Sequence, residues 1–131
     1  MENRTIVLEF LDYLRYEKGS SENTLESYNR DLNIFFSNTE KNFTEINDED
    51  IISYVDKISK TIKRNTTLRK IASLRSFYRF CFVNKYNRRL MEDKLVTLAI
   101  LTYAKAQILK NVLENEGIET YIHNVNQIQP V

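Results

Sequence analysis

The sequence is poor in the residues that mark several common classes of protein. Its 131 residues include one cysteine, one histidine, one proline, two glycines and no tryptophan. The single cysteine, Cys81, excludes an internal disulfide and a cysteine cluster for zinc, and we expect it to be a small buried side chain on a helix. Gly19 and Gly117 are too few for a glycine-rich phosphate loop. We therefore expect no cofactor, no metal and no nucleotide-driven chemistry.

Long apolar runs are also missing. No stretch of about eighteen apolar residues is present to span a membrane, and the first ten residues, MENRTIVLEF, include acids and lack the apolar core of a signal peptide. A hydrophobic content of 42% is nevertheless enough for a core. These features predict a folded, cytoplasmic protein with no membrane partner.

Charge is unevenly distributed along the chain. The segment from Glu40 to Asp56 holds six acids and one base, whereas the segment from Lys57 to Met91 holds eleven bases and no acid, in a chain with a net charge of only +1. A phosphate backbone rewards such a basic segment, because each neutralised phosphate releases counterions. The pattern indicates nucleic acid, with a solvated helix face as the alternative.

Four helices are predicted before residue 87 from apolar residues spaced three and four apart. They cover Arg4 to Lys18, Ser20 or Ser21 to about Asn38, a segment that begins at Asn47, and Arg64 to Asn84. Asn47 is a good helix cap, with Asp50 at the third helical position and Ile46 and Ile51 placed for a hydrophobic staple. Helices joined by such short connections predict a compact bundle.

The helix from Arg64 to Asn84 has a polar side without acids. A rotation of about 100° per residue gathers hydroxyl and guanidinium side chains there, with Lys70 at the edge. These are Thr66, Arg69, Ser73, Ser76 and Arg79. A solvated face more often includes glutamates that form i,i+4 pairs, so the pattern favours DNA.

Three segments of the sequence carry a resemblance to a known family of proteins. EKGSSENTLESYNRDL (Glu17–Leu32), INDEDIISYV (Ile46–Val55) and LRKIASLRSFYRF (Leu68–Phe80) resemble the N-terminal, SAM-like core-binding domain of tyrosine recombinases and phage integrases of the Xer type. The resemblance implies a four-helix bundle that forms half of a C-shaped clamp, with its second and fourth helices against the major groove.

The same resemblance nominates DNA-contacting residues on those two helices. Arg69, Lys70, Arg75 and Arg79 would mostly contact phosphates, while Arg75 has the alternative of packing its stem on the bundle. The full set is Asn23, Thr24, Arg30, Thr66, Thr67, Arg69, Lys70, Ser73, Arg75 and Arg79.

Strand cleavage is not expected from these residues. The catalytic domain of tyrosine recombinases supplies a nucleophilic tyrosine, paired arginines, a lysine and a His-x-x-Arg signature. The only histidine, His123, is followed by Asn-Val-Asn, so that signature is missing. We therefore predict a binding module and no enzyme, without catalytic residues or metal ligands.

Beyond Asn87 the composition changes. Residues 92–131 contain three bases and five acids. Lys94–Tyr103 has the apolar run of a buried strand, Ala104–Glu116 has helical spacing, and Ile118–Val125 alternates as a second strand, which predicts an incomplete βαβ unit. This segment weakly resembles the first βαβ of small bacterial signal-transducing and universal-stress-like proteins. Since MEDKLV, from Met91, reads as a protein start, a fusion of two genes is one hypothesis.

The sequence therefore predicts a mainly α protein with two parts. Residues 1–88 are expected to form a four-helix, SAM-like core-binding domain, and residues 92–131 a truncated βαβ, ferredoxin-like half. The expected partner is double-stranded DNA, through its major groove and phosphates, with recombinase subunits as a further partner, in DNA integration and recombination. The alternatives are a protein-interaction module and a signalling protein whose function resides in the βαβ tail.

Overall fold

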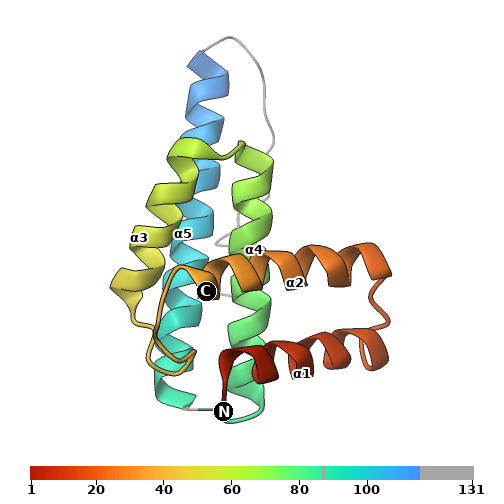
Figure 1. The fold of residues 1–131 in the computed structure, drawn as a ribbon. Helices are drawn as coiled ribbons and strands as arrows, with labels where there is room; N and C mark the ends of the chain where they lie inside the picture. Colours follow the sequence, from red (N-terminus) through yellow and green to blue (C-terminus); the bar gives the residue numbers. More distant parts are fainter. Residues whose placement is uncertain (87, 116–131) are drawn as a thin grey trace, which may run out of the picture.

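The protein is a bundle of helices in two orientations. The computed structural model describes residues 1–86 and 88–115, which form five helices and, within those ranges, no strand. Helices α3, α4 and α5 run side by side, and α1 and α2 lie across them (Figure 1). The bounds are α1 Asn3–Tyr16, α2 Glu22–Ser37, α3 Asp48–Thr61, α4 Arg64–Val83 and α5 Arg88–Asn115. The prediction of a mainly helical protein with four helices before residue 87 is confirmed.

The starts of α2 and α3 are set by capping side chains. Asn47 Oδ1 accepts a hydrogen bond from the Asp50 backbone N–H at 2.9 Å, and Asp50 Oδ2 accepts one from the Asn47 backbone N–H at 2.9 Å. Ile46 and Ile51 on either side of this capping box are buried. Ser21 caps α2 by accepting from the Thr24 backbone N–H at 3.2 Å. Each cap satisfies amides that the first turn of a helix leaves free.

The core is centred on aromatic side chains of α4. The Phe77 ring is fully buried and packs edge-on against rings of α1, α2 and the loop before α3, namely Phe10, Phe36 and Phe43. The neighbouring Tyr78 donates its hydroxyl to the Phe43 carbonyl at 3.1 Å. Cys81 is buried as expected, and burial raises its pKa to about 12. Helix α4 is thus the central element that the other four contact.

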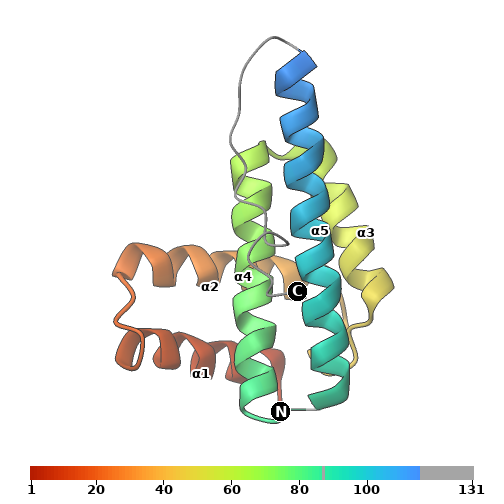
Figure 2. The same cartoon turned by 180° about the vertical axis from the view of Figure 1, so that it is seen from behind.

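The predicted strand at Lys94–Tyr103 is wrong, because these residues lie within α5. Within α5, Met91, Lys94 and Leu98 are buried at spacings of three and four. The helix runs alongside α4 and α3 (Figure 2). A ten-residue apolar run fits a strand or a buried helix equally well by pattern alone, and the helix satisfies its backbone hydrogen bonds internally where a strand without a described partner would not. The predicted helix from Ala104 coincides with α5 as far as Asn115, and the second predicted strand, Ile118–Val125, lies outside the described residues.

Helix α5 joins the same core as the first four helices. Met91 and Leu98 belong to the cluster of buried side chains that includes Phe77. The Lys94 side chain is 1% exposed, its Nζ lies 5.2 Å from the centre of the Tyr78 ring, and it has no hydrogen-bond partner within the described residues. The division of the chain near residues 88–92 into two domains stays a prediction.

Candidate nucleic-acid interface

Helix α2 covers part of the predicted polar side of α4. Asp31, on α2, is 3% exposed and contacts three residues of that side. Arg69 donates to it through Nε at 3.0 Å and Nη2 at 2.8 Å. Lys70 Nζ donates to Asp31 Oδ1 at 3.2 Å, and Ser73 Oγ donates to Oδ2 at 3.0 Å. We call this set, Asp31, Arg69, Lys70 and Ser73, the Asp31 junction.

The Asp31 carboxyl is ionised because of its partners. Burial alone would raise its pKa, but hydrogen bonds from Arg69, Ser73 and Lys70, in that order of size, together hold the pKa below its usual value. The same contact raises the pKa of Arg69. A buried carboxylate with four donated bonds and two adjacent cations is a satisfied structural centre, so the junction fixes how α2 crosses α4.

Three of the ten nominated residues are buried and do not lie on a surface that a duplex could touch. Lys70 is 6% exposed and Ser73 is fully buried, both in the Asp31 junction, and Thr67 is 4% exposed with its hydroxyl donating to the Lys63 carbonyl at 3.2 Å. The expected phosphate or base contacts of these side chains are therefore corrected. The rotation of about 100° per residue correctly predicted that Arg69, Lys70 and Ser73 lie together on α4. It did not predict that α2 covers this side of the helix.

The other seven nominated residues are accessible. Asn23, Arg30 and Arg79 are exposed, and Thr24, Thr66, Arg69 and Arg75 are partly exposed. Thr24 also accepts a hydrogen bond from the Ser21 hydroxyl at 3.0 Å in the α2 cap. Whether any of them contacts DNA stays a prediction.

The exposed side of α4 carries a line of arginines. Arg64 and Arg79 are exposed and Arg75 is half-buried, and helical geometry places the three within about a quarter turn of one another. In the described part of the chain no carboxylate forms an ion pair with them. Arg75, which the sequence placed beside the apolar arc, is therefore on the accessible side with Arg79.

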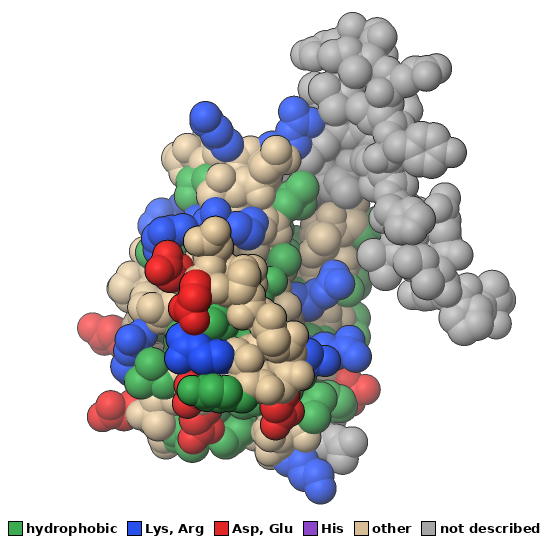
Figure 3. Space-filling model, turned by 90° about the vertical axis from the view of Figure 1, so that its right-hand side faces the viewer, with side chains coloured by type: hydrophobic (Ala, Val, Ile, Leu, Met, Phe, Trp, Pro, Cys, Tyr) green, Lys and Arg blue, Asp and Glu red, His purple; other side chains and the backbone are tan. Residues whose placement is uncertain are grey.

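Basic residues also gather where α3 ends and α4 begins. Lys57, Lys60, Lys63 and Arg64 are all exposed there. Lys60 pairs with Asp56 at 3.1 Å, and for the other three the described residues provide no ion pair. Figure 3 shows Lys and Arg side chains at this upper end of the molecule without acidic neighbours, while acidic side chains occur in the middle and lower parts of the same face.

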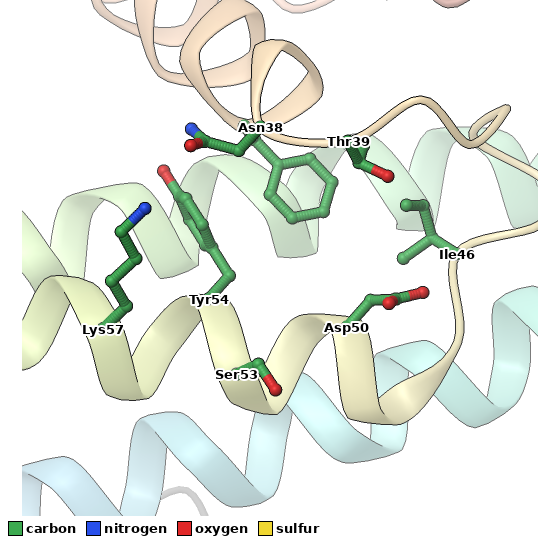
Figure 4. A pocket seen from close by; sticks show the side chains of 8 residues that line it. Asn38, Thr39, Ile46, Asp50, Ser53, Tyr54 and Lys57 are labelled. Carbon is green, nitrogen blue, oxygen red and sulfur yellow. The ribbon is translucent and has the colours of Figure 1, made fainter.

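A polar hollow of about 230 Å³ lies between the end of α2 and α3. The polar ends of Asn38, Tyr54 and Lys57 point toward the same part of it (Figure 4). The Tyr54 hydroxyl is buried without a hydrogen-bond partner among the described residues, and its pKa is raised by burial and by the negative charge of Asp31. The Tyr54 hydroxyl therefore lies within electrostatic range of Asp31.

Sequence reasoning missed Asp31 and Tyr54. A signal for Asp31 was present, because this carboxylate lies three residues after Tyr28 and four before Phe35, on the apolar stripe of α2. An acid on an apolar face requires a buried cation, and α4 offers two adjacent ones. Tyr54 gives no such signal, since it fits an ordinary core position.

Two further kinds of feature are absent from the described residues. Among them, no group of three or more His, Cys, Asp or Glu side chains is placed to hold a metal ion. None of the helices in the described ranges is long and apolar enough to cross a membrane.

Comparison with known proteins identifies the family of this helical bundle, in which α2 crosses the basic central helix α4. The family model for the phage integrase N-terminal SAM-like domain matches residues 7–85, and the chain belongs to this family. The matched range covers α2, α3 and α4 and most of α1, so the resemblance expected from the sequence is confirmed for this part.

The similar curated proteins are tyrosine recombinases. The chain is 40% identical over 115 residues to tyrosine recombinase XerC of Leptospira interrogans serogroup Icterohaemorrhagiae serovar copenhageni, with 84% of this chain and 36% of the relative covered. It is 29% identical over 132 residues to XerD of Listeria innocua, covering 96% and 43%, and 30% identical over 129 residues to XerD of Haemophilus ducreyi, covering 96% and 42%. The chain thus spans about two fifths of the length of these relatives.

The comparisons support a recombinase core-binding role and do not favour the signalling alternative. The expected resemblance of residues 92–131 to universal-stress-like proteins is not shown, and the XerD alignments cover so much of the chain that they extend into this segment. No solved structure matches the chain.

Proposed function

We propose that the chain binds double-stranded DNA as the core-binding module of a tyrosine-type, site-specific recombinase. Family membership supports the role, and the observation that carries it is the group of exposed cations at the α3–α4 turn and along α4 that have no carboxylate partner among the described residues. Unpaired surface cations repel one another unless an anionic partner neutralises them.

The proposed surface runs from the α3–α4 turn to the corner that α2 forms with the N-terminal half of α4. Arg64 is exposed at the turn, Asn23 and Arg30 are exposed on α2, and Arg69 lies where α2 crosses α4 at the Asp31 junction (Figure 1). A duplex that lies in this corner meets cations from two helices held in a fixed relation. Recombinase subunits remain a second proposed partner, and we propose no strand cleavage by these residues.

Binding should depend strongly on salt. With about four to six phosphate contacts, the logarithm of the affinity should fall with log salt with a slope of about −0.9 per contact. Fluorescence anisotropy of the full chain against random and palindromic duplexes measures this slope and any preference for sequence. A slope near zero would exclude the phosphate-dominated mode.

Charge reversal at one end of α4 tests the surface. Arg64→Glu should weaken binding by about tenfold or more, because an attractive contact becomes repulsive. Lys85→Glu is the matched control, since Lys85 is also exposed in the basic segment but lies beyond the other end of α4, about 30 Å away by helix geometry. Equal losses in the two variants would argue for a diffuse charge effect and against the assigned corner.

The Asp31 junction also changes which variants are informative. A joint Arg69→Glu and Lys70→Glu exchange would place two acids against a buried carboxylate and would be expected to unfold the bundle. Exposed positions such as Arg30 and Arg64 avoid this difficulty.

A further inference from the structure

Only one of the two cations in the Asp31 junction reaches the surface. The Arg69 side chain is 38% exposed, whereas those of Lys70 and Asp31 are 7% and 2% exposed. The junction therefore has a closed inner part and one outward-facing guanidinium, at the edge of the corner between α2 and α4.

The guanidinium is held from one side. Its Nε and Nη2 donate to the two oxygens of Asp31, which leaves both N–H groups of Nη1 and one of Nη2 from its five donors. The carboxylate is itself fixed by Lys70 and Ser73. An arginine held in this way has already lost most of its side-chain freedom, so less entropy is lost when its remaining donors bind.

We propose that Asp31 is a positioning residue for DNA binding, which orients Arg69 so that its free N–H groups meet a phosphate of the duplex. This inference rests on the proposed function and adds a buried acidic residue to the recognition surface. Asp31 does not itself touch DNA.

The negative charge of Asp31 does not oppose this role. Two cations share the carboxylate, so the junction keeps a net positive charge facing an approaching phosphate. The lowered pKa of Asp31 keeps it ionised at neutral pH. Simple electrostatics makes the opposite prediction, because removing a carboxylate near DNA would strengthen binding if the carboxylate only competed for Arg69. The sign of the change in DNA affinity therefore distinguishes a carboxylate that positions Arg69 from one that only competes for it.

A double-mutant cycle on DNA affinity tests the proposal. We expect Asp31→Asn and Arg69→Ala each to lose about tenfold in affinity, the size expected for one charge-assisted hydrogen-bonded contact. The double variant should lose no more than Arg69→Ala alone, since Asp31 acts through Arg69. Both single variants should also reduce the salt slope by about 0.9, which a merely structural loss of folded protein would not change.

Lys94→Met is the matched control. It removes a buried lysine that contacts the Tyr78 ring and has no contact with the Asp31 junction, so DNA affinity should stay within about twofold, well under the effect of one charge-assisted contact. Circular dichroism at the assay temperature establishes the folded fraction of every variant. If Asp31→Asn does not fold, Ser73→Ala takes its place, with a twofold to threefold loss expected from one weaker hydrogen bond, absent when Arg69 is alanine.

Two results would overturn the proposal for Asp31, and a third would overturn the proposed function. Equal or tighter DNA binding by folded Asp31→Asn would overturn the proposal, as would a loss that persists undiminished in the Arg69→Ala background. An unchanged chain that binds no duplex at all would instead overturn the proposed function.

Discussion

The contact of α2 with α4 and the contact of α5 with α4 each bury a lysine, and they differ in what the ammonium group meets. Lys70 donates to a carboxylate at 3.2 Å, and that carboxylate is further satisfied by Arg69 and Ser73. Lys94 meets the face of the Tyr78 ring at 5.2 Å, with no hydrogen-bond partner in the described ranges. The two contacts therefore bury similar charges with different compensation.

The difference shows how specifically each helix is held. A shift of α2 along α4 would break four directed hydrogen bonds around Asp31, so few alternative packings are compatible with the sequence. The α5 contact is mainly apolar and less directional. Val96 and Ile100 on the outer side of α5 are 55% and 61% exposed, so the helix has apolar residues on both sides and a weaker preference for the side it buries.

The largest expected effect comes from removing the carboxylate that distinguishes the first contact. Asp31→Ala leaves the buried Lys70 and the half-buried Arg69 without a counter-charge, and the free energy of unfolding should fall by about 3–5 kcal/mol. Urea denaturation followed by circular dichroism measures the change. Asp56→Ala is the control, since its pair with Lys60 is exposed and should contribute less than about 1 kcal/mol. Similar small losses in both variants would show that the Asp31 junction is not a stabilising centre.

Replacing each lysine by methionine should change stability in opposite directions. Lys94→Met should raise the free energy of unfolding by about 1 kcal/mol, because the desolvation penalty of an unpaired ammonium is several kcal/mol and a cation–π contact returns only about 1–2. Lys70→Met should lower it by about 1–2 kcal/mol, since one hydrogen bond to a charged group is lost while Asp31 keeps Arg69. The same urea measurement serves for both, and losses of equal sign would remove the distinction between the two contacts.

The two regions also differ in how well the sequence predicted them. The first four helices followed from apolar spacing and caps, with Asn47 and Ile46 giving the start of α3 to within one residue. The segment Lys94–Tyr103 was predicted as a strand because its largely apolar run fits a strand or a buried helix. What decided the outcome was the packing of Met91 and Leu98 on α4, which is long-range information.

The sequence predicted which residues of α4 lie together, but it did not predict which side of the helix is exposed. Arg69, Lys70 and Ser73 do lie together, but Asp31 turns part of that set into a buried centre. Helical angles give the relative positions of side chains on one helix, and they leave open which side its neighbours cover. Helix α4 is contacted by four helices, so its apolar arc was a poor guide to its narrow exposed side.

The smallest expected effect is the pH dependence that follows from Lys94. Burial lowers the pKa of Lys94 below the value of 10.5 in the unfolded chain, so the unfolded chain binds this proton more tightly. The loss of stability caused by burying the charged ammonium is therefore fully present below the folded pKa. It fades as the pH rises toward 10.5. The stability gained by Lys94→Met, about 1 kcal/mol at neutral pH, should therefore shrink as the pH rises through the folded pKa of Lys94 toward 10.5.

The measurement is the difference in urea midpoint between the unchanged chain and Lys94→Met at each pH. A difference is needed because burial also raises the pKa values of Cys81 and Tyr78, and these groups remove stability from both proteins as the pH rises above their unfolded values. Asp31 acts at the other end of the scale, where its lowered pKa means that its stabilisation is present above pH 3.8 and is lost as the pH falls through the folded value. A difference between the two proteins that stays constant from neutral to alkaline pH would mean that the Lys94 ammonium is already well compensated, and that α5 is held as specifically as α2.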